Sequence, residues 1–297
     1  MEKINILFNP HAGNGNGESF AKKLVEYYDG KKLDFVDMTK ISSCKDFLSS
    51  LETDEKIVVA GGDGTLHRFV NEIYDVERKN DIYYYAAGSG NDFLVDLGRK
   101  KGAEPFLINE YIEKLPMATI GGKSYRFLNN MSFGIDGYCC EEGDRVRQKT
   151  TKPVNYTSIA IKALLYKYRP TNAKVTLDGV THEFEKVWLA PAMNGRFCGG
   201  GMMLAPNQDR LAKDRVLSFL IMYGAGSLKT LTMFPSVFTG TQEKYDKYVK
   251  IVTAKNISVE FDRPVSAQID GETILDVTRY DAVTYELAPK KQEEAVR

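Results

Sequence analysis

Three glycines and one aspartate occupy residues 61–64, directly after the apolar run 57–60. Such a run is typical of a buried parallel strand, and the apolar residues of 66–73 recur at helical spacing. A strand that turns through glycine into a helix points backbone N–H groups and the positive helix end at one place, which favours phosphate. Asp63 adds a carboxylate there, which suits a divalent cation bound between it and the phosphates. A plain turn with Asp63 or Thr65 as helix cap explains the same residues.

Two further strand-to-helix junctions are rich in glycine and polar residues. Residues 9–17 follow the predicted strand 4–8, and residues 87–93 follow the predicted strand 82–86. The first fits neither the dinucleotide pattern nor the P-loop, so alone it indicates a flexible turn. The carboxyl ends of parallel strands meet at one edge of a doubly wound sheet. We therefore expect one crevice there, lined by Asp63, Ser89, Asn91 and Asp92, although Asn91 and Asp92 also suit a helix cap.

A second acidic motif lies near the other end of the chain. Residues 268–272 end a predicted strand with Asp270 and Glu272 on either side of Gly271. Asp-Gly is common in hairpin turns, and so a plain turn and a functional pair of carboxylates are equally good interpretations of the motif alone.

Composition limits the class of protein. The 297 residues include 40 basic and 40 acidic side chains, and this balance gives no indication of a nucleic-acid partner. No apolar run reaches the roughly 20 residues of a membrane-spanning helix, and the first residues lack a signal peptide's apolar region. The four cysteines show no metal or redox spacing, which predicts reduced thiols in a cytoplasmic protein. Only three histidines are present, which argues against a histidine metal site or catalytic triad.

The order of predicted elements indicates an α/β protein with two domains. Residues 1–122 alternate strands and helices, which predicts a doubly wound, mostly parallel sheet. Residues 123–289 are dominated by alternating apolar and polar residues, which predicts a mostly antiparallel β-sandwich interrupted by helices near 138–147, 156–168 and 227–238. Residues 290–297 form a charged tail. A cleft between the domains is the natural place for a second substrate.

The ordered set of motifs resembles the diacylglycerol kinase catalytic-domain family, especially its bacterial lipid kinases. That family carries Asn-Pro-x-x-Gly, Gly-Gly-Asp-Gly-Thr, Gly-Thr/Ser-x-Asn-Asp-Phe and Asp-Gly-Glu in this order. The corresponding segments here begin at Asn9, Gly61, Gly88 and Asp270, so the resemblance spans nearly the whole chain. It implies phosphorylation of a lipid hydroxyl by ATP with Mg²⁺, in a nucleotide-binding first domain and a lipid-binding second domain.

The resemblance also implies roles for individual residues. Asp63 would act with Mg²⁺ near the transferred phosphate, and Glu272 would accept the proton of the lipid hydroxyl. The nucleotide-binding positions correspond to Asn9, Pro10, His11, Ala12, Gly13, Thr39, Gly62, Asp63, Gly64, Thr65, Leu66, His67, Arg68 and Ser89, and the predicted crevice adds Asn91 and Asp92. The family has Asn-Glu where this chain has His67 and Arg68.

The segment 204–218 resembles a second family site, at which an aspartate and carbonyl groups hold a structural Mg²⁺. The corresponding ligands are Asp214 and the carbonyls of Leu211 and Val216. Lys213, Arg215 and Ser218 stand where the family has an acid, a glycine and an acid. Fewer acids weaken Mg²⁺ binding, and so a metal-free surface turn is an equal alternative.

Two other functions share part of this pattern. A kinase of a soluble acceptor, such as NAD or a sugar phosphate, would use a similar Gly-Gly-Asp-Gly turn, and a non-catalytic nucleotide-binding regulator would keep the fold. A lipid kinase predicts transient, peripheral membrane contact, for which Lys149, Lys152, Lys162, Lys167 and Arg169 with nearby aromatics offer a surface unless they form a solvated helix face. A homodimer is left open. Diacylglycerol, monoacylglycerol, phosphatidylglycerol, undecaprenol and sphingoid bases all present a suitable hydroxyl, and the sequence does not choose among them.

Overall fold

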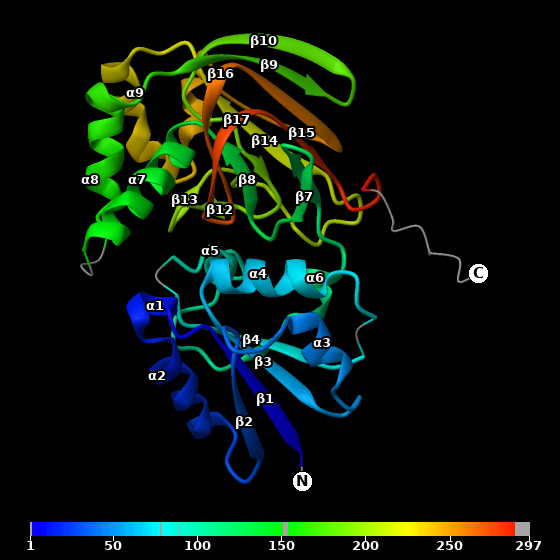
Figure 1. Ribbon diagram of the computed structural model, residues 1–297. Coiled ribbons are helices and arrows are strands. Elements are labelled where there is room, and N and C mark those ends of the chain that lie inside the picture. Colours follow the sequence, from blue (N-terminus) through cyan, green and yellow to red (C-terminus); the bar gives the residue numbers. More distant parts are fainter. Residues whose placement is uncertain (1, 78, 89, 151–153, 289–297) are drawn as a thin grey trace.

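The three apolar runs near the start of the chain form the central strands of a sheet in the computed structural model, which describes residues 2–77, 79–88, 90–150 and 154–288 (Figure 1). The strand order is β2-β1-β3-β4-β5, and all neighbours are parallel except β4 with β5. These strands are β1 (Lys3–Phe8), β2 (Lys32–Asp37), β3 (Lys56–Gly61), β4 (Ile82–Ala86) and β5 (Phe106–Leu107). Nearly every residue of β1, β3 and β4 is buried, because helices cover both faces of the sheet.

The helices of the first domain divide between the two faces of this sheet, which confirms the doubly wound prediction. They are α1 (Ala12–Gly15), α2 (Gly17–Lys22), η1 (Lys23–Tyr27), α3 (Cys44–Ser49), α4 (Asp63–Ile73), α5 (Asp92–Asp96) and α6 (Asn109–Glu113). Helix α4 buries Leu66, Phe69, Val70 and Ile73 in one core, as their spacing predicts. Ala21 of α2 and Leu24 of η1 pack on the opposite face.

The second domain contains one large antiparallel sheet, as expected from its alternating pattern. The strand order is β15-β14-β11-β8-β16-β17-β6-β7, and β9 pairs with both β10 and β16. The strands are β6 (Met117–Ile120), β7 (Lys123–Arg126), β8 (Asn130–Phe133), β9 (Thr171–Leu177), β10 (Val180–Val187), β11 (Ala192–Met193), β14 (Leu217–Met222), β15 (Val249–Ala254), β16 (Asn256–Ile269) and β17 (Glu272–Val283). A separate small pair is formed by β12 (Phe197–Cys198) and β13 (Met202–Met203).

The long strand β16 gives this sheet its sandwich-like curl. Its first half pairs with β9 and its last residues pair with β8, and its pairing with β17 shifts register between Glu260 and Ala267. Bulges of this kind bend a strand and increase its twist. The bent strand therefore delivers its final residues, up to Ile269, to the domain interface.

Helices cover one face of the second sheet. They are α7 (Ile135–Lys149), α8 (Tyr156–Lys162), η2 (Ala163–Lys167), α9 (Ser227–Met233), η3 (Phe234–Phe238) and η4 (Gln242–Tyr245). The three predicted helical segments are therefore present, the first beginning at Ile135 and the other two each divided into two short helices. Their apolar residues share a core with Trp188, Leu220 and Met222 of the sheet side.

The structure differs from the predicted domain division at its boundary. Strands β6 and β7 form a hairpin of the second sheet, and the predicted boundary after residue 122 falls inside the turn of this hairpin. Gly121 and Gly122 both have positive φ, at 56° and 79°, which is the backbone of a two-residue hairpin turn. These glycines therefore form a turn within the second sheet, and the division lies before β6. The predicted tail 290–297 lies outside the described residues.

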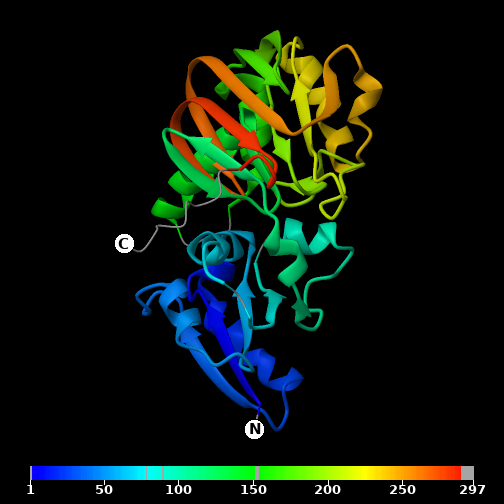
Figure 2. The same cartoon turned by 90° about the vertical axis from the view of Figure 1, so that its right-hand side faces the viewer.

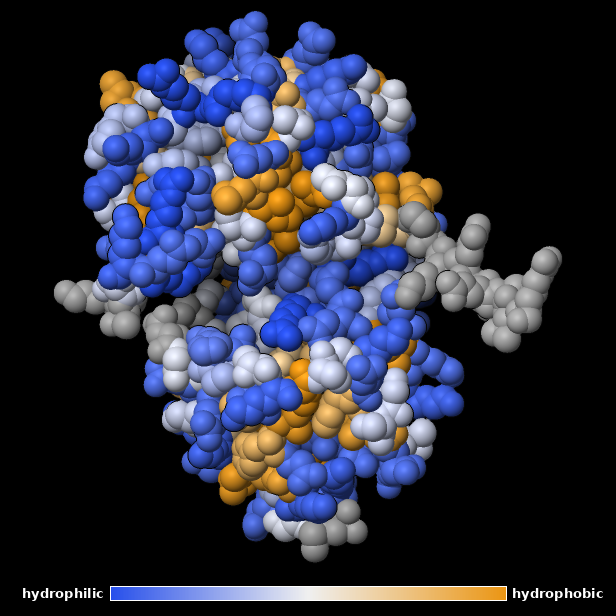
Figure 3. Space-filling view, in the orientation of Figure 1, coloured by the Kyte–Doolittle hydropathy of each residue, from blue (hydrophilic) through white to orange (hydrophobic). Residues whose placement is uncertain are grey.

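The two domains are stacked along the long axis of the molecule, with the N-terminal end of the chain at the far end of the first domain (Figure 2). The face shown in Figure 3 narrows to a waist between them, where the surface is largely hydrophilic. Within the described residues, no helix combines the length and hydropathy required to cross a bilayer.

Candidate functional site

The Gly-Gly-Asp-Gly turn lies directly against the loop that follows β4. A Cβ added to Gly88 would be 2.4 Å from the Cα of Gly62, and one added to Gly62 would be 2.9 Å from the Cα of Gly88. Gly62 has φ −96°, so it is the close approach of two backbones, and not a positive φ, that requires glycine here. The loops that follow β3 and β4 are thus in direct contact.

The loop after β1 joins the same edge. Gly13 has φ +59°, and a Cβ there would lie 2.9 Å from the carbonyl oxygen of Ala87. The Asn9 side chain accepts a hydrogen bond of 3.0 Å from the N–H of His11, and the Asn9 carbonyl accepts one from Ala12. All three glycine-rich junctions therefore converge, as their positions after parallel strands predict.

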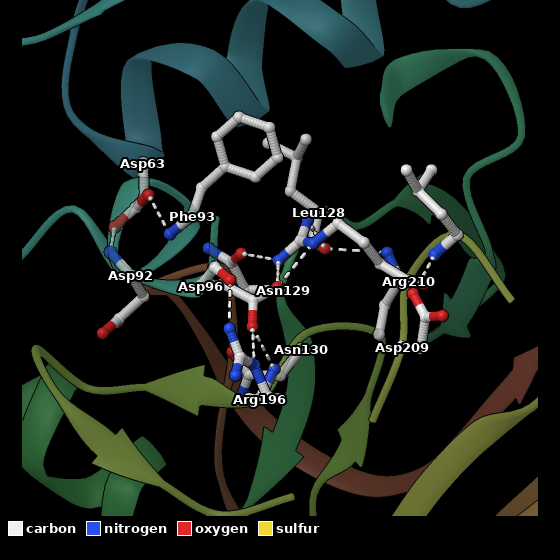
Figure 4. Close-up of polar contacts among 12 residues, drawn as sticks. Asp63, Asp92, Phe93, Asp96, Leu128, Asn129, Asn130, Arg196, Asp209 and Arg210 are labelled. Atoms are coloured by element: carbon white, nitrogen blue, oxygen red, sulfur yellow. Dashed lines mark hydrogen bonds and ion pairs between the residues drawn. The ribbon is translucent and has the colours of Figure 1, made fainter. Parts of the chain in front are cut away.

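Asp63 connects two of these junctions with its side chain. One carboxylate oxygen accepts the N–H of Asp92 at 2.7 Å, and the other accepts the N–H of Phe93 at 3.2 Å (Figure 4). Asp63 thus binds the first amides of α5, while its own helix α4 has Gly62 as its N-cap residue and no side-chain cap. Burial, reinforced by the negative charge of Asp92, raises the pKa of Asp63 to about 7.

Asp92 links the first domain to the second. Its carboxylate oxygens accept the N–H groups of Gly200 and Gly201, at 2.9 and 2.8 Å, in the loop between β12 and β13. Burial also raises the pKa of this carboxyl, despite the two N–H bonds that lower it. The preceding residue, Asn91, has φ 54° and holds the N–H and carbonyl of Gly88 with its side-chain amide.

The Asp270–Gly271 pair forms a two-residue turn between β16 and β17 that reaches into this region from the second domain. Both residues have positive φ, at 47° and 92°, and Ile269 pairs with Glu272 across the turn. The carboxylate of Glu272 lies beside Gly64, because a Cβ on that glycine would be 2.5 Å from Glu272 Oε1. The two interpretations of this motif are therefore compatible, since a hairpin turn carries an acid to the first domain's glycine loop.

Asp270 fixes the turn in place. Its carboxylate accepts backbone N–H groups of residues 128, 129 and 130 at 2.7, 2.7 and 3.1 Å. It also contacts Nδ1 of His67 at 2.9 Å, and both side chains are buried. Gln268 accepts the N–H of Gly271 and donates to the buried Asp136, whose other carboxylate oxygen has no partner within the described residues. The turn is therefore fixed by the side chain of Asp270 and by the side chain of Gln268.

Some predicted nucleotide-binding side chains lie outside this convergence or have other contacts. Arg68 forms an ion pair with Glu72 at 2.7 Å, and Glu72 in turn accepts the N–H of Cys44, so Arg68 braces α4 against α3. Thr39 bonds to Asp37 beyond β2. The side chain of Leu66 belongs to the first-domain core, and Ser89 lies outside the described residues.

The segment matched to a second Mg²⁺ site is held by side-chain hydrogen bonds. Gln208 donates to the Val216 carbonyl at 2.9 Å and accepts from Ser218 at 2.6 Å. Arg215 donates to the Arg210 carbonyl at 2.6 Å. The described residues contain no group of three or more histidine, cysteine or acidic side chains arranged to hold a metal. The Val216 carbonyl, predicted as a ligand, accepts one hydrogen bond here, and the Mg²⁺ site with Asp214 and Leu211 stays a prediction.

A buried ion cluster next to this segment was not foreseen from the sequence. Asp96 accepts hydrogen bonds from Arg196 Nε at 2.8 Å and from Arg210 Nε at 2.6 Å (Figure 4). Arg210 is only 4% exposed and also donates to the carbonyl of Leu128 and to Asn129. The partners are about 100 residues apart in sequence, so no local pattern could have indicated this pairing.

Comparison with known proteins places this geometry in a family. Residues 3–118 match the model of the diacylglycerol kinase catalytic domain, and residues 129–290 match the YegS C-terminal NAD kinase beta sandwich-like domain. The chain belongs to the YegS-like diacylglycerol kinase catalytic-domain family. This is a family of lipid kinases, and membership of a kinase family implies ATP as the phosphoryl donor.

Individual relatives agree with this assignment. The chain is similar to a diacylglycerol kinase of Mycobacterium tuberculosis, with 24% identity over 87% of this chain and 85% of the relative. It is also 22% identical to a diacylglycerol kinase of Bacillus subtilis, over 92% and 90% of the two chains. A crystal structure of a diacylglycerol kinase from Bacillus anthracis superposes with a TM-score of 0.58 at 20% identity, covering 95% of this chain and 93% of that one. At this level of identity, the similarity to the Bacillus anthracis structure shows a shared fold.

Proposed function

We propose that this family member transfers the γ-phosphate of ATP to the hydroxyl of a diacylglycerol-like lipid. The observation that carries the proposal is the position of Glu272, whose carboxylate comes from the second domain and lies beside Gly64 of the first. A phosphate bound at the glycine loops and a hydroxyl bound in the second domain would meet at this contact. Phosphoryl transfer depends mostly on such positioning.

The nucleotide side of the proposal rests on backbone groups. The converging junctions after β1, β3 and β4 surround the N-terminal end of α4, whose first backbone N–H groups would bind the phosphates. We also propose that Thr39 and Arg68, which the resemblance implies, contact the bound nucleotide from the edge of the site. Arg68 would first have to leave its ion pair with Glu72.

Mg²⁺ suits the charge of this site. The carboxylate of Asp92 is buried and that of Asp63 is half-buried, and the negative charge of Asp92 helps to raise the pKa of Asp63. A cation would offset this buried negative charge, and Mg²⁺ is typically held by one or two carboxylates together with substrate phosphates. Asp63 is the residue that would hold it, and the ion would supply charge neutralisation at the transferred phosphate.

Glu272 is proposed to accept the proton of the lipid hydroxyl. A carboxylate of ordinary basicity is a weak base for an alcohol, and so the proton would leave late, as charge moves toward the leaving group. The protein would work in the cytoplasm and meet its substrate at a membrane surface.

A lipid panel tests the proposal. Transfer of labelled phosphate from ATP should occur to one or more of diacylglycerol, monoacylglycerol, phosphatidylglycerol, undecaprenol and sphingosine, in the presence of Mg²⁺. Transfer only to water-soluble acceptors would instead support the alternative function, a kinase of a soluble metabolite. Nucleotide binding without transfer to any acceptor would indicate a regulator.

The Glu272→Gln variant tests the role of the acid. Loss of the proton acceptor should lower kcat about 10²–10⁴-fold with little change in ATP binding. Glu183→Gln, which changes an exposed acid of β10, is the matched control and should keep the wild-type rate. Equal rates for Glu272→Gln and the control would refute the role of Glu272.

A further inference from the structure

One face of helix α4 is turned toward the second domain. Figure 1 shows this helix on the side of the first domain that faces the second. Gly64, His67 and Asn71 follow one another at intervals of three and four residues, so they share a face of the helix. We call these three residues the α4 face. The apolar residues of α4 lie on its other side in the first-domain core, so the helix holds the α4 face rigidly.

Each residue of the α4 face contacts the second domain. Asn71 exchanges hydrogen bonds of 2.8 and 2.9 Å with the backbone at the end of β7. Nδ1 of His67 lies 2.9 Å from Oδ2 of Asp270. A Cβ at Gly64 would lie 2.5 Å from Oε1 of Glu272. The helix therefore touches the second domain at three successive points, and two of them involve the turn between β16 and β17.

The contact between His67 and Asp270 is buried and has a defined direction. The two side chains are 8% and 0% exposed. Both oxygens of Asp270 already accept backbone N–H groups of residues 128–130, so Nδ1 of His67 is the donor in this contact. A hydrogen bond to a carboxylate is stronger in such an enclosed place than in water, because the local dielectric constant is low. His67 thus ties the turn to α4.

The turn that His67 holds also carries Glu272. Glu272 follows Asp270 by two residues and is itself exposed, so its carboxylate is positioned by the turn and not by packing around the side chain. Gly64 and His67 are nearly one helical turn apart, about 4.5 Å along the axis. Two contacts at this spacing fix both the position and the tilt of the turn, whereas the contact at Gly64 alone would let the turn rotate.

We propose that His67 is a positioning residue for phosphoryl transfer. Its hydrogen bond to Asp270 holds the turn so that Glu272 faces the N-terminal end of α4, where the proposed function places the phosphates. A displacement of a reacting group by about 1 Å can lower a rate about 10²-fold, so this bond bears directly on the rate. The inference rests on the proposed function, because that function gives Glu272 its role.

Two substitutions at position 67 separate the hydrogen bond from the volume of the ring. His67→Leu removes the donor and keeps an apolar group, whereas His67→Asn keeps an N–H donor at the same point of the side chain. His67→Leu should lower kcat at least about tenfold and change the KM for ATP less than about threefold, and His67→Asn should keep most of the rate. His182→Leu, the same substitution at an exposed histidine of β10, is the control and should match the wild type.

A double variant shows whether His67 acts through Glu272. In the Glu272→Gln background, His67→Leu should lower kcat by less than about twofold more, because the group that His67 positions has lost its function. A further loss as large as in the wild-type background would overturn the proposal. Equal losses in His67→Leu and His67→Asn would also overturn it, because the donor would then have no effect.

Hydrogen–deuterium exchange tests the same contact without catalysis. The amides of residues 270–272 should exchange at least about tenfold faster in His67→Leu than in the wild type, and at the wild-type rate in His67→Asn. Unchanged exchange in His67→Leu would overturn the positioning role. Faster exchange in His67→Leu, with no phosphorylation of any lipid by the wild type, would refute the proposed function and leave His67 as the residue that holds the turn.

Discussion

At the scale of single residues, Asp63 combines two demands in one carboxylate. Both of its oxygens accept N–H groups at the start of α5, so it fixes the relative positions of two glycine loops. The same carboxyl is partly buried, and its desolvation raises its pKa to about 7. A side chain that holds a loop in the free protein is thus also placed to respond to a cation.

The raised pKa of Asp63 predicts a specific dependence of stability on pH. Between its ordinary value of 3.8 and about 7, the folded protein keeps a proton that the unfolded chain releases. The stability contributed by this protonated carboxyl is complete below about pH 4 and is lost as pH rises through 7. Urea unfolding at about pH 5 and about pH 8 should show a loss of up to about 3 kcal/mol that is absent in Asp63→Asn. Identical pH profiles for the two proteins would contradict this assignment.

Gly64 offers a way to move Glu272 without removing it. A Cβ at position 64 would meet the end of the flexible Glu272 side chain, so Gly64→Ala should displace that carboxylate and little else. Because alanine favours a helix, stability should stay the same or rise by up to about 1 kcal/mol. We expect kcat to fall by at least about tenfold, and kinetics with thermal unfolding on one sample would measure both effects. A stable variant with full activity would show that the contact is not needed.

The sequence indicated most of the residues of this site, because glycine junctions after buried strands and the Asp-Gly turn are local patterns. It did not indicate what several of these residues contact. Nothing near Asp92 in the chain points to Gly200, and His67 finds its partner Asp270 about 200 residues away. Arg68 was expected near phosphate but pairs with Glu72 on its own helix, a local alternative that helical spacing allows.

At the scale of elements, the site depends on two loops whose backbones touch. Gly62 lies at the start of α4 and Gly88 follows β4, and a side chain on either would overlap the other's backbone. Parallel strands bring such loops to one edge, but only glycine lets them come this close. The element pattern was readable from sequence for this reason, whereas the pairing of β6 with β7 across Gly121 and Gly122 was not among the predicted features.

Substitution at Gly88 should therefore separate the loops. Gly88→Ala would place a Cβ 2.4 Å from the Gly62 Cα, and the resulting backbone shift should cost about 1–3 kcal/mol. ATP should also protect the variant against heat less than it protects the wild type. Gly226→Ala is the control, because that position is open and should change stability by no more than about 1 kcal/mol. Equal ATP protection in both variants would argue against loop contact as a requirement for binding.

At the scale of the whole molecule, the domains are joined by polar contacts that cross in both directions. Asp92 of the first domain holds amides of the second, and Asp270 of the second domain contacts His67 of the first. Asn71 of α4 exchanges two hydrogen bonds with the backbone of Arg126, at 2.8 and 2.9 Å. Asp96 completes the interface by pairing with Arg196 and Arg210.

Removing the charge of Asp96 tests the strength of this interface. Asp96→Asn would leave the guanidinium of Arg210 buried without its counter-ion, which should lower the free energy of unfolding by about 3–5 kcal/mol. Asp34→Asn breaks an exposed pair with Lys3 and should cost less than about 1 kcal/mol. Urea unfolding of both variants measures the contrast, and similar losses in the two would mean that the buried cluster contributes little.

The reciprocal links of Asp92 and Asp270 also bear on how the chain melts. Neither half can separate from the other without breaking the bonds of Asp92 to the amides of Gly200 and Gly201 and the contact of Asp270 with His67. Domain pairs joined only by a linker usually denature one after the other, but here the first half to loosen would forfeit the contacts that steady its neighbour. Calorimetry should accordingly record one endotherm, with its van't Hoff and calorimetric enthalpies in agreement, because the two lobes would unfold as a single cooperative unit.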